Sequence, residues 1–563
     1  MNVDCLFSLK KKARINFSNR RSGFAGAAAP PFWQRFSLAI LHLSLGLSLP
    51  PLLVTRTLAA EKIYLDYGPL QFSLAVESLE LYAREGKINS DLADYARLFT
   101  PKQLENLKTA LVTSAEITPL AVAQFLYSPQ GERILEQVGQ VIQTKAGQPG
   151  FYAIRSALIL AAAEPEGLTP LNILKNFPTY GIRINSQRGL AIIEKLSNIV
   201  QQTEMAIAAV EEEASRQKKA NLADASSFPN FNQPGKFTFE KITLTLKERQ
   251  RRRIFPVDLY LPQQQSLLLR RFPLVIISHG LGSDRLTFAY LASHLASYGF
   301  AVAVPEHPGS SASQLQALFN GFASEVTPAR ELIDRPLDIK YLLDYLEENY
   351  NRQIDVRHAG IIGQSFGGYT ALALAGAKFD FNLLTQACAN FDNSLNVSLL
   401  LQCLALELPN PKINLQDRRI VAALAINPFT SGLFGREGLS QIEIPIMLVS
   451  SSADPVTPAL WEQIEPFTWL KTAHKYLALL IGGTHFSTLA PSDDVVPLPS
   501  QAIGPDPAIA QNYLQQLSLI FFNAYVANLP EYRDYLNADY AAAISQELMP
   551  LSLVRSLFLP QSN

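Results

Sequence analysis

The sequence predicts a helical module followed by an α/β domain, whose mostly parallel sheet is covered by helices on both faces. Three observations predict this class. From residue 236 onward, short apolar runs alternate with helix-like segments, as in parallel strands joined by right-handed crossovers. Between residues 61 and 216, apolar side chains instead recur every three or four residues, which is typical of amphipathic helices. Within the second part, an apolar run meets Gly363-Gln-Ser-Phe-Gly367 and then a strong helix former, so a serine stands where a strand turns into a helix.

Composition bounds what the chain can do. With 563 residues, 48% hydrophobic and 17% charged, it can bury large cores in more than one domain. The formal net charge of −1 gives no overall field that would attract nucleic acid. The basic run Arg249–Arg253 lies between two strand-like segments, so we interpret it as a solvated hairpin tip. Three cysteines are too few for a disulfide scaffold or a zinc site, so we expect no metal.

The first sixty residues resemble an export signal. Basic residues precede an apolar run from Leu38 to Val54, and Thr57-Leu-Ala59 supplies small residues for cleavage near Ala59-Ala60. The alternative is an uncleaved anchor, but seventeen residues containing Pro50 and Pro51 are short for a spanning helix. We therefore predict a signal peptide over residues 1–60 and a mature protein in the periplasm or outside the cell.

Residues 61–216 are predicted to form an all-α module. Four helix starts pair a hydroxyl residue that can cap the first amides with a proline that lacks one. These hydroxyl residues are Thr100, Thr118, Ser128 and Thr169. Gln103 completes a capping box with the first of them. No cluster of cysteines, histidines or paired acids suggests chemistry here, so the role of the module stays open.

Residues 217–235, rich in Ser, Asn and Pro towards their end, are predicted to be a linker, and residues 236–563 the α/β domain. Strands are expected at 237–246, 254–261, 272–278, 300–304, 359–364, 420–426, 444–450 and 476–481, with helices at 286–298 and 336–348. An insertion over residues 379–419 contains Cys388 and Cys403. In an exported protein these two could form a disulfide, and two buried thiols are the alternative.

The serine of the strand-to-helix turn is a candidate nucleophile. A serine needs a base to take its proton and an acid to orient that base, and in this class of fold they follow in the order Ser, Asp, His. His485 follows a predicted strand on a glycine-rich loop, so we assign it as the base that serves Ser365. Asp454 follows the preceding strand and is the expected acid. His474 leads into a strand and is expected to be solvated.

Two backbone amides are expected to stabilise the oxyanion of the tetrahedral intermediate. One is the amide of Phe366, which follows the nucleophile, and Gly363 and Gly367 let strand and helix approach closely around it. The other is the amide of Leu281, in the loop after the strand that ends at Ser278. His279 precedes Ser365 in the chain, so we expect it to shape that loop rather than to act as the base.

These segments resemble the α/β-hydrolase superfamily. The residues that carry the resemblance are Ser278-His-Gly-Leu-Gly-Ser-Asp-Arg285, Leu295-Ala-Ser-Tyr-Gly-Phe300, Val304-Pro-Glu-His-Pro308 and Gly363-Gln-Ser-Phe-Gly-Gly368. More narrowly, they are similar to the platelet-activating-factor acetylhydrolase and dienelactone-hydrolase-like branch. The resemblance implies a serine esterase that needs no cofactor and acts on acyl esters, in the acetylhydrolases those of phospholipids. The helical module also resembles the N-terminal part of a family of exported bacterial hydrolases.

Two positions depart from the acetylhydrolase pattern. Gln364 replaces the histidine that usually precedes the nucleophile, and Asn427 stands where those enzymes carry their acid. Asp454 occupies the position that most other α/β-hydrolases use.

The sequence thus favours an exported serine hydrolase of carboxylic, lipid-like esters that uses Ser365, Asp454 and His485. A lactone, thioester or amide hydrolase with the same residues is one alternative, and a non-catalytic binding protein on this fold is another. Expected partners are a small-molecule or lipid ester and, as a hypothesis, a membrane surface, but not nucleic acid. We also hypothesise that the helical module covers the site.

Overall fold

The computed structural model describes residues 59–67, 70–218, 228–263, 271–391, 394–409, 414–492 and 500–559. The predicted signal segment, apart from Ala59 and Ala60, lies outside the described residues. Residues Leu58–Asn563 form one compact unit, which contains the N-terminal module and the α/β domain. None of the helices within the described ranges is both long enough and apolar enough to cross a bilayer.

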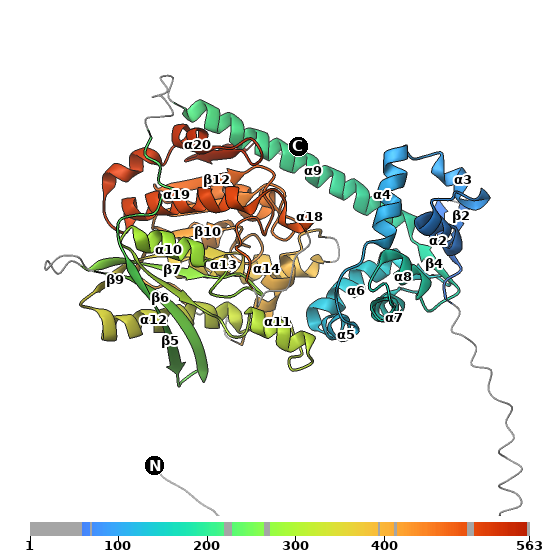
Figure 1. The fold of residues 1–563 in the computed structure, drawn as a ribbon, viewed down its shortest axis with the longest axis horizontal. Coiled ribbons are helices and arrows are strands. Elements are labelled where there is room, and N and C mark those ends of the chain that lie inside the picture. Colours follow the sequence, from blue (N-terminus) through green and yellow to red (C-terminus); the bar gives the residue numbers. More distant parts are fainter. Residues whose placement is uncertain are drawn as a thin grey trace, which may run out of the picture. The chain divides into compact units, whose positions relative to one another are not determined.

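The N-terminal module is mostly helical (Figure 1). Its helices are α2 (Val76–Glu85), α3 (Ser90–Ala96), α4 (Pro101–Val112), α5 (Pro119–Leu126), α6 (Pro129–Val141), α7 (Phe151–Ala162), α8 (Pro170–Lys175) and α9 (Ser186–Gln217). Thr100, Thr118, Ser128 and Thr169 each accept a hydrogen bond from an amide of the first turn, and the capping box of Thr100 and Gln103 is present. The predicted helix starts are therefore confirmed.

The prediction that this module is all-α is wrong in one respect, because it also contains a four-stranded sheet of order β2-β1-β4-β3. The strands are β1 (Lys62–Tyr67), β2 (Leu70–Ala75), β3 (Ile142–Thr144) and β4 (Gly181–Ile184). Each has six residues or fewer, so a two-residue alternation is too short to stand out beside the helical periodicity.

The α/β domain is built on a nine-stranded sheet of order β13-β12-β11-β10-β9-β7-β8-β6-β5. The strands are β5 (Phe239–Glu248), β6 (Arg253–Pro262), β7 (Phe272–Ser278), β8 (Ala301–Pro305), β9 (Ile354–Gln364), β10 (Ile420–Ile426), β11 (Ile446–Ser451), β12 (Lys475–Leu480) and β13 (Leu551–Val554). The strands from β7 to β12 run parallel, whereas β5, β6 and β13 pair antiparallel at the edges. All the strands predicted for this sheet are present, and of its nine described strands the four-residue β13 was not predicted.

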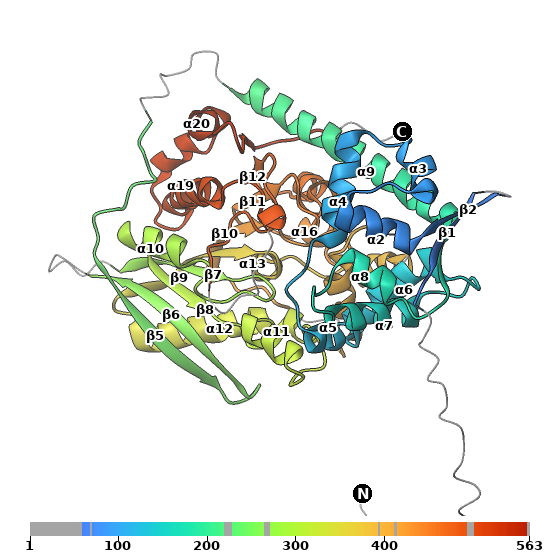
Figure 2. The same ribbon diagram turned by 45° about the vertical axis from the view of Figure 1, so that its right-hand side comes forward.

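Helices cover both faces of this sheet (Figures 1 and 2). On one face, α10 (Ala289–Ser297), α19 (Pro507–Tyr525) and α20 (Ala538–Ile544) bury their apolar sides against the strands. On the other face, α12 (Glu331–Tyr350), α13 (Phe366–Ala375) and α17 (Glu465–Trp469) do the same. Both faces of the central strands are therefore dry, which explains their nearly continuous apolar sequences.

Helix α9 packs on both parts of the chain. Its residues Ala206, Val210 and Ala214 are buried in the same apolar cluster as α12 and α13, and Val210 is 0% exposed. Its last turn is tied to the C-terminal segment, where Ser556 donates a hydrogen bond to Glu213. The second half of α9 thus completes the core of the α/β domain.

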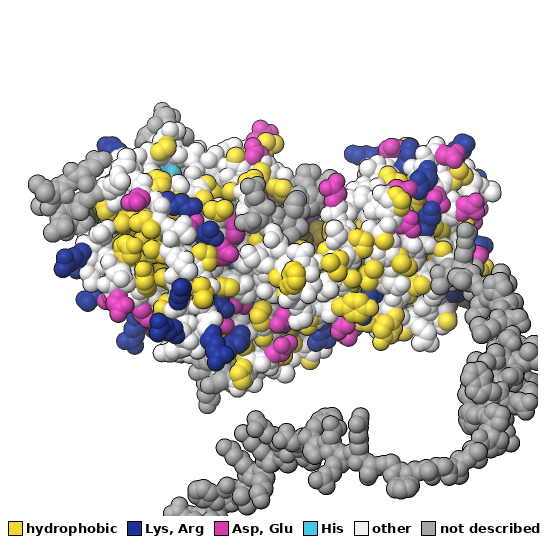
Figure 3. All heavy atoms as spheres, turned by 60° about the horizontal axis from the view of Figure 1, so that its bottom comes forward, with side chains coloured by type: hydrophobic (Ala, Val, Ile, Leu, Met, Phe, Trp, Pro, Cys, Tyr) yellow, Lys and Arg dark blue, Asp and Glu magenta, His cyan; other side chains and the backbone are white. Residues whose placement is uncertain are grey.

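The remaining elements of the α/β domain are short. They are α11 (Ala312–Phe319), α14 (Phe381–Ala389), α15 (Leu399–Gln402), η4 (Cys403–Glu407), α16 (Gly435–Leu439), η5 (Leu460–Ile464), α18 (Ser500–Ile503) and η6 (Pro530–Tyr535). In the predicted insertion, Cys388 on α14 and Cys403 at the start of η4 are joined by a disulfide. The space-filling view shows acidic and basic side chains interspersed on one face, with no field of a single sign (Figure 3).

A buried carboxylate holds the insertion in place. Glu462 on η5 is 0% exposed and accepts hydrogen bonds from the side chains of Asn396, Ser398 and Gln402 in the insertion. It also accepts from the amides of Thr430 and Ser431, in the loop after β10. One charge therefore joins three segments that are far apart in the sequence.

We expect Glu462→Gln to lower the free energy of unfolding by about 3 kcal/mol, because an amide nitrogen would face donors that now bond a carboxylate. Urea unfolding of the variant and of Glu437→Gln, an exposed glutamate on α16, would measure this. The control should change by less than about 0.5 kcal/mol. Equal stability of the two variants would contradict the role given to Glu462.

Candidate active site

Ser365 occupies a strained turn between β9 and α13. Its φ of 54° and ψ of −114° lie where residues with a side chain are rarely found. A Cβ at Gly363 would come within 1.9 Å of the carbonyl oxygen of Gly367, and one at Gly367 within 1.9 Å of that of Ser278. Both glycines are thus required by close backbone approach, as the sequence predicted. The turn places the serine at the carboxyl end of the parallel strands.

His485 and Asp454 meet at the same edge of the sheet. The Nδ1 atom of His485, in the loop after β12, lies 2.6 Å from Oδ2 of Asp454, in the loop after β11. The other carboxylate oxygen, Oδ1, accepts hydrogen bonds from the amides of Val456 (2.7 Å) and Thr457 (2.8 Å). Because a carboxylate only accepts, Nδ1 carries the imidazole hydrogen and Nε2 is left as the basic nitrogen.

Ser365 is linked to this pair through its neighbour in the chain. The side-chain amide of Gln364 donates to the backbone carbonyl of His485 at 3.2 Å. Ser365, Asp454 and His485 are 5%, 6% and 4% exposed, so all three are nearly shielded from water. The described contacts include no hydrogen bond between the Ser365 hydroxyl and the His485 ring, a contact that often tightens only when substrate binds.

Asn427, at the position where the acetylhydrolase pattern has its acid, does not contact His485 by any described hydrogen bond. Its Oδ1 accepts from the amide of Ser451 and its Nδ2 donates to the Ser451 hydroxyl, so the side chain joins β10 to β11. Asp454 is the carboxylate that the structure brings to the imidazole.

His474, which was expected to be solvated, is partly buried against Tyr525, with ring centroids 5.3 Å apart.

The backbone amides of both predicted oxyanion donors are free of described protein acceptors. Phe366 is the first residue of α13, so no carbonyl of its own helix is available to its amide. Leu281 lies in the loop after β7, and no described protein group accepts a hydrogen bond from either amide. His279 is buried in this loop, where its Nε2 accepts the amide hydrogen of His307 at 3.0 Å, so it shapes the loop as predicted.

Family models match two segments of the chain. Residues 59–185 match the family described as "Alpha/beta hydrolase of unknown function (DUF1400)", and residues 263–335 match "Platelet-activating factor acetylhydrolase, isoform II". The second match includes the loop of His279 and Leu281, and the nine-stranded sheet carries the serine turn in the expected place. The chain therefore has an α/β-hydrolase fold.

Two curated proteins are similar to part of this chain. The platelet-activating factor acetylhydrolase of Bos taurus is 31% identical over 139 residues, and that of Canis lupus familiaris is 32% identical over 139 residues. Each match covers 18% of this chain and 31% of the relative, so the chain spans about a third of the relatives it matches.

The α/β domain holds a second set of Ser, His and Asp residues that the sequence did not indicate. The Ser278 hydroxyl lies 3.0 Å from Nε2 of His307, and Nδ1 of His307 lies 3.1 Å from Oδ2 of Asp338. All three are 0% exposed, and burial holds the pKa of His307 well below its usual range. Because no substrate can reach them, these residues support the loops around the site. In the sequence, the segment Glu306-His-Pro308 after β8 was the one feature that pointed to these residues.

The prediction of a solvated tip at Arg249–Arg253 is wrong for two of its arginines. The side chains of Arg251 and Arg253 are 13% and 12% exposed and pair with Asp338 at 2.9 Å and 2.7 Å. The hairpin folds back onto α12, so its basic residues neutralise carboxylates there instead of facing water. This long-range pairing leaves no trace in the local sequence.

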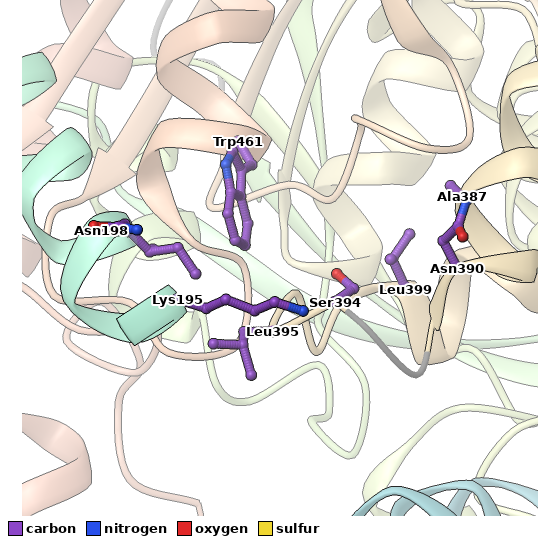
Figure 4. A pocket seen from close by; sticks show the side chains of 9 residues that line it. Lys195, Asn198, Ala387, Asn390, Ser394, Leu395, Leu399 and Trp461 are labelled. Carbon is purple, nitrogen blue, oxygen red and sulfur yellow. The ribbon is translucent and has the colours of Figure 1, made fainter. Parts of the chain in front are cut away.

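Two cavities with mixed apolar and polar linings adjoin the insertion. One, of about 510 Å³, is lined by Ile199 of α9, Leu395, Leu399 and Trp461 of η5. Figure 4 shows the side chain of Lys195, also from α9, extending across it towards Ser394. The other, of about 730 Å³, lies between α6 and α9 and shares Leu395.

Within the described part of the chain, no group of three or more His, Cys, Asp and Glu residues could hold a metal ion.

Proposed function

We propose that this protein is an exported serine hydrolase that cleaves carboxylic esters with lipid-like acyl groups through an acyl-enzyme. The observation that carries the proposal is the imidazole of His485, held at 2.6 Å by Asp454 and linked through Gln364 to the strained turn of Ser365. A buried carboxylate that orients a histidine near a strained serine has little use in a protein that only binds.

In the proposed reaction, Nε2 of His485 takes the hydroxyl proton of Ser365 while Oγ attacks the ester carbonyl. The amides of Leu281 and Phe366 donate to the oxyanion that forms. The imidazolium then protonates the departing alkoxide, and the acyl group stays on Oγ. In the second half, His485 takes a proton from water, the hydroxide attacks the acyl carbonyl, and Ser365 recovers its proton as the acid leaves.

The similarity to platelet-activating factor acetylhydrolases supports an ester rather than an amide, lactone or thioester as substrate. A series of p-nitrophenyl esters from acetate to palmitate, assayed with and without a fluorophosphonate, tests the proposal. We expect turnover of the esters and its loss after labelling. Labelling without ester turnover would favour one of the other acyl substrates, and neither labelling nor turnover would favour a binding protein.

The N-terminal module is proposed to cover the site and to provide walls for the acyl chain. Gln137 of α6 donates to the backbone of Phe391 in the insertion, so the module contacts the segment that lines both cavities. Trp461 lies on η5, which follows the loop of Asp454, so one segment of the chain contributes both to the smaller cavity and to the candidate site. Apolar walls that exclude water suit a long acyl chain.

We expect Ile192→Trp, which fills the larger cavity, to lower kcat/KM for a p-nitrophenyl palmitate by about tenfold and to leave the acetate unchanged. Ile193→Trp is the matched control, because Ile193 is 63% exposed on the same helix and does not line the cavity. Equal effects of the two variants on both esters would show that the module does not contribute to the binding of the acyl chain.

Export and membrane contact are parts of the same proposal. The disulfide between Cys388 and Cys403 supports an oxidising compartment. Four apolar side chains on α5 and α7 and the turn after α5 are exposed and could rest on a lipid surface: Leu120, Tyr127, Tyr152 and Leu160. N-terminal sequencing of the protein from the exported fraction tests the predicted cleavage near Ala59-Ala60.

A further inference from the structure

Arg335 is a fully buried arginine that the proposed reaction does not use. It projects from α12, is 0% exposed, and donates to the backbone carbonyls of His279 and Gly280 at 2.7 Å and 3.3 Å. Burying a guanidinium costs free energy unless its N–H groups are hydrogen-bonded. Because the group is planar and rigid, its acceptors must lie at fixed positions around it. The two carbonyls that it binds belong to the loop that carries Leu281.

The carbonyl of Gly280 and the amide of Leu281 are parts of one peptide group. A peptide unit is planar and trans, so its C=O and N–H point in opposite directions. By holding the Gly280 carbonyl towards the interior, Arg335 turns the Leu281 N–H away from the interior. Among the described contacts, that amide donates to no protein group, which leaves it available for an oxyanion.

The same guanidinium also packs on the residue that supplies the other amide. Its central carbon lies 4.3 Å from the ring centroid of Phe366, which is itself 0% exposed. One side chain therefore touches both halves of the proposed oxyanion hole. A cation at this position would also favour negative charge developing nearby in a site that excludes water.

The guanidinium of Arg335 is held in place by further hydrogen bonds. Its Nε donates to the Ser310 hydroxyl at 2.8 Å, and that hydroxyl donates to Oε2 of Glu331 at 2.6 Å. His279 adds a second donor to the Gly280 carbonyl, because its Nε2 accepts from His307 and its Nδ1, 2.8 Å from that carbonyl, carries the hydrogen. Burial keeps the pKa of His279 well below its usual range, so the ring stays neutral and this tautomer persists.

We propose that Arg335 is a positioning residue of the oxyanion hole, which aims the Leu281 amide at the substrate oxyanion and braces Phe366. This inference rests on the proposed function, because the oxyanion in question forms in the proposed acyl transfer. It assigns a catalytic contribution to a residue far from Leu281 in the sequence and without contact to substrate.

The test compares Arg335→Met and Arg335→Lys with Arg251→Met. Arg251, in the β5–β6 turn, belongs to the same charged cluster and pairs with Asp334 and Asp338 of α12, but it has no described contact with the loop of Leu281 or with Phe366. For each folded variant we would measure kcat and KM for p-nitrophenyl acetate, and the affinity for a trifluoromethyl ketone. Such ketones form an oxyanionic adduct with serine enzymes, so they report on the hole directly.

We expect Arg335→Met to lower kcat by about 100-fold with KM changed less than about threefold, and the ketone affinity to fall in step with kcat/KM. Arg251→Met should retain kcat even if its melting temperature falls as much. Should Arg335→Met fail to fold, Arg335→Lys decides, because one ammonium cannot bind both carbonyls in the planar geometry of a guanidinium and kcat should still fall. Full kcat in a folded Arg335 variant, or equal losses in Arg335→Met and Arg251→Met, would overturn the proposal. An inactive wild-type protein would instead overturn the proposed function itself.

Discussion

Ser365→Ala is expected to abolish ester turnover and covalent labelling by a fluorophosphonate while leaving the fold intact. The hydroxyl is the only group that the proposed chemistry can acylate, and its loss leaves only the weak catalysis that binding and the oxyanion donors provide. The decrease in kcat should be about 10⁶-fold, so that the residual rate is close to background. Alanine keeps the Cβ of the strained turn, so circular dichroism and the melting temperature should match the wild type.

The control for this variant is Ser440→Ala, because Ser440 lies just after α16 and its hydroxyl bonds only a backbone carbonyl in the described contacts. It should keep full activity and labelling. Labelling retained by Ser365→Ala would place the nucleophile elsewhere and contradict the assignment.

Asp454→Asn is expected to lower kcat by about 10³–10⁴-fold with little change in KM. The carboxylate now accepts the Nδ1 hydrogen of His485 at 2.6 Å, whereas the amide nitrogen of an asparagine could stabilise the tautomer with its hydrogen on Nε2. In that tautomer the ring cannot take a proton from Ser365. The measurement is steady-state kinetics on p-nitrophenyl acetate over a range of pH.

Asn427→Ala provides the contrast, because Asn427 stands at the acid position of the acetylhydrolase pattern but bonds Ser451 instead of the imidazole. Its effect on kcat should be far smaller than that of Asp454→Asn. A reversed order of the two effects would show that the acid is assigned to the wrong strand.

The candidate catalytic residues could be selected from the sequence because each is set by a local pattern. Gly363 and Gly367 flank the serine because neighbouring backbone lies too close to them for a side chain to fit. This requirement for glycine can be recognised in the sequence as a motif. Asp454 and His485 follow buried strands whose apolar runs are easily recognised, and the carboxyl ends of parallel strands meet at one edge. The helix starts of the module were equally local, since a hydroxyl residue before a proline can cap a helix without help from other segments.

What the sequence did not indicate depends on contacts between distant segments. Arg335 binds the carbonyls of His279 and Gly280 across more than fifty residues of chain, and nothing next to it marks that role. The arginines of the β5–β6 turn resemble a solvated tip because their acidic partners lie on α12. The short strands β1 to β4 form only because they pair with one another, since none is long enough to be recognised by its own pattern.

Trapping the acyl-enzyme tests the central claim most directly. The full-length mature protein would be mixed with excess p-nitrophenyl acetate, quenched in acid within the first turnover, digested and analysed by mass spectrometry. The proposed function predicts one acetyl group on the peptide that contains Ser365, formed in step with a burst of nitrophenol and absent from Ser365→Ala. Steady ester turnover with an acetyl group on another residue, or with none on Ser365 even when deacylation is slowed, would contradict it.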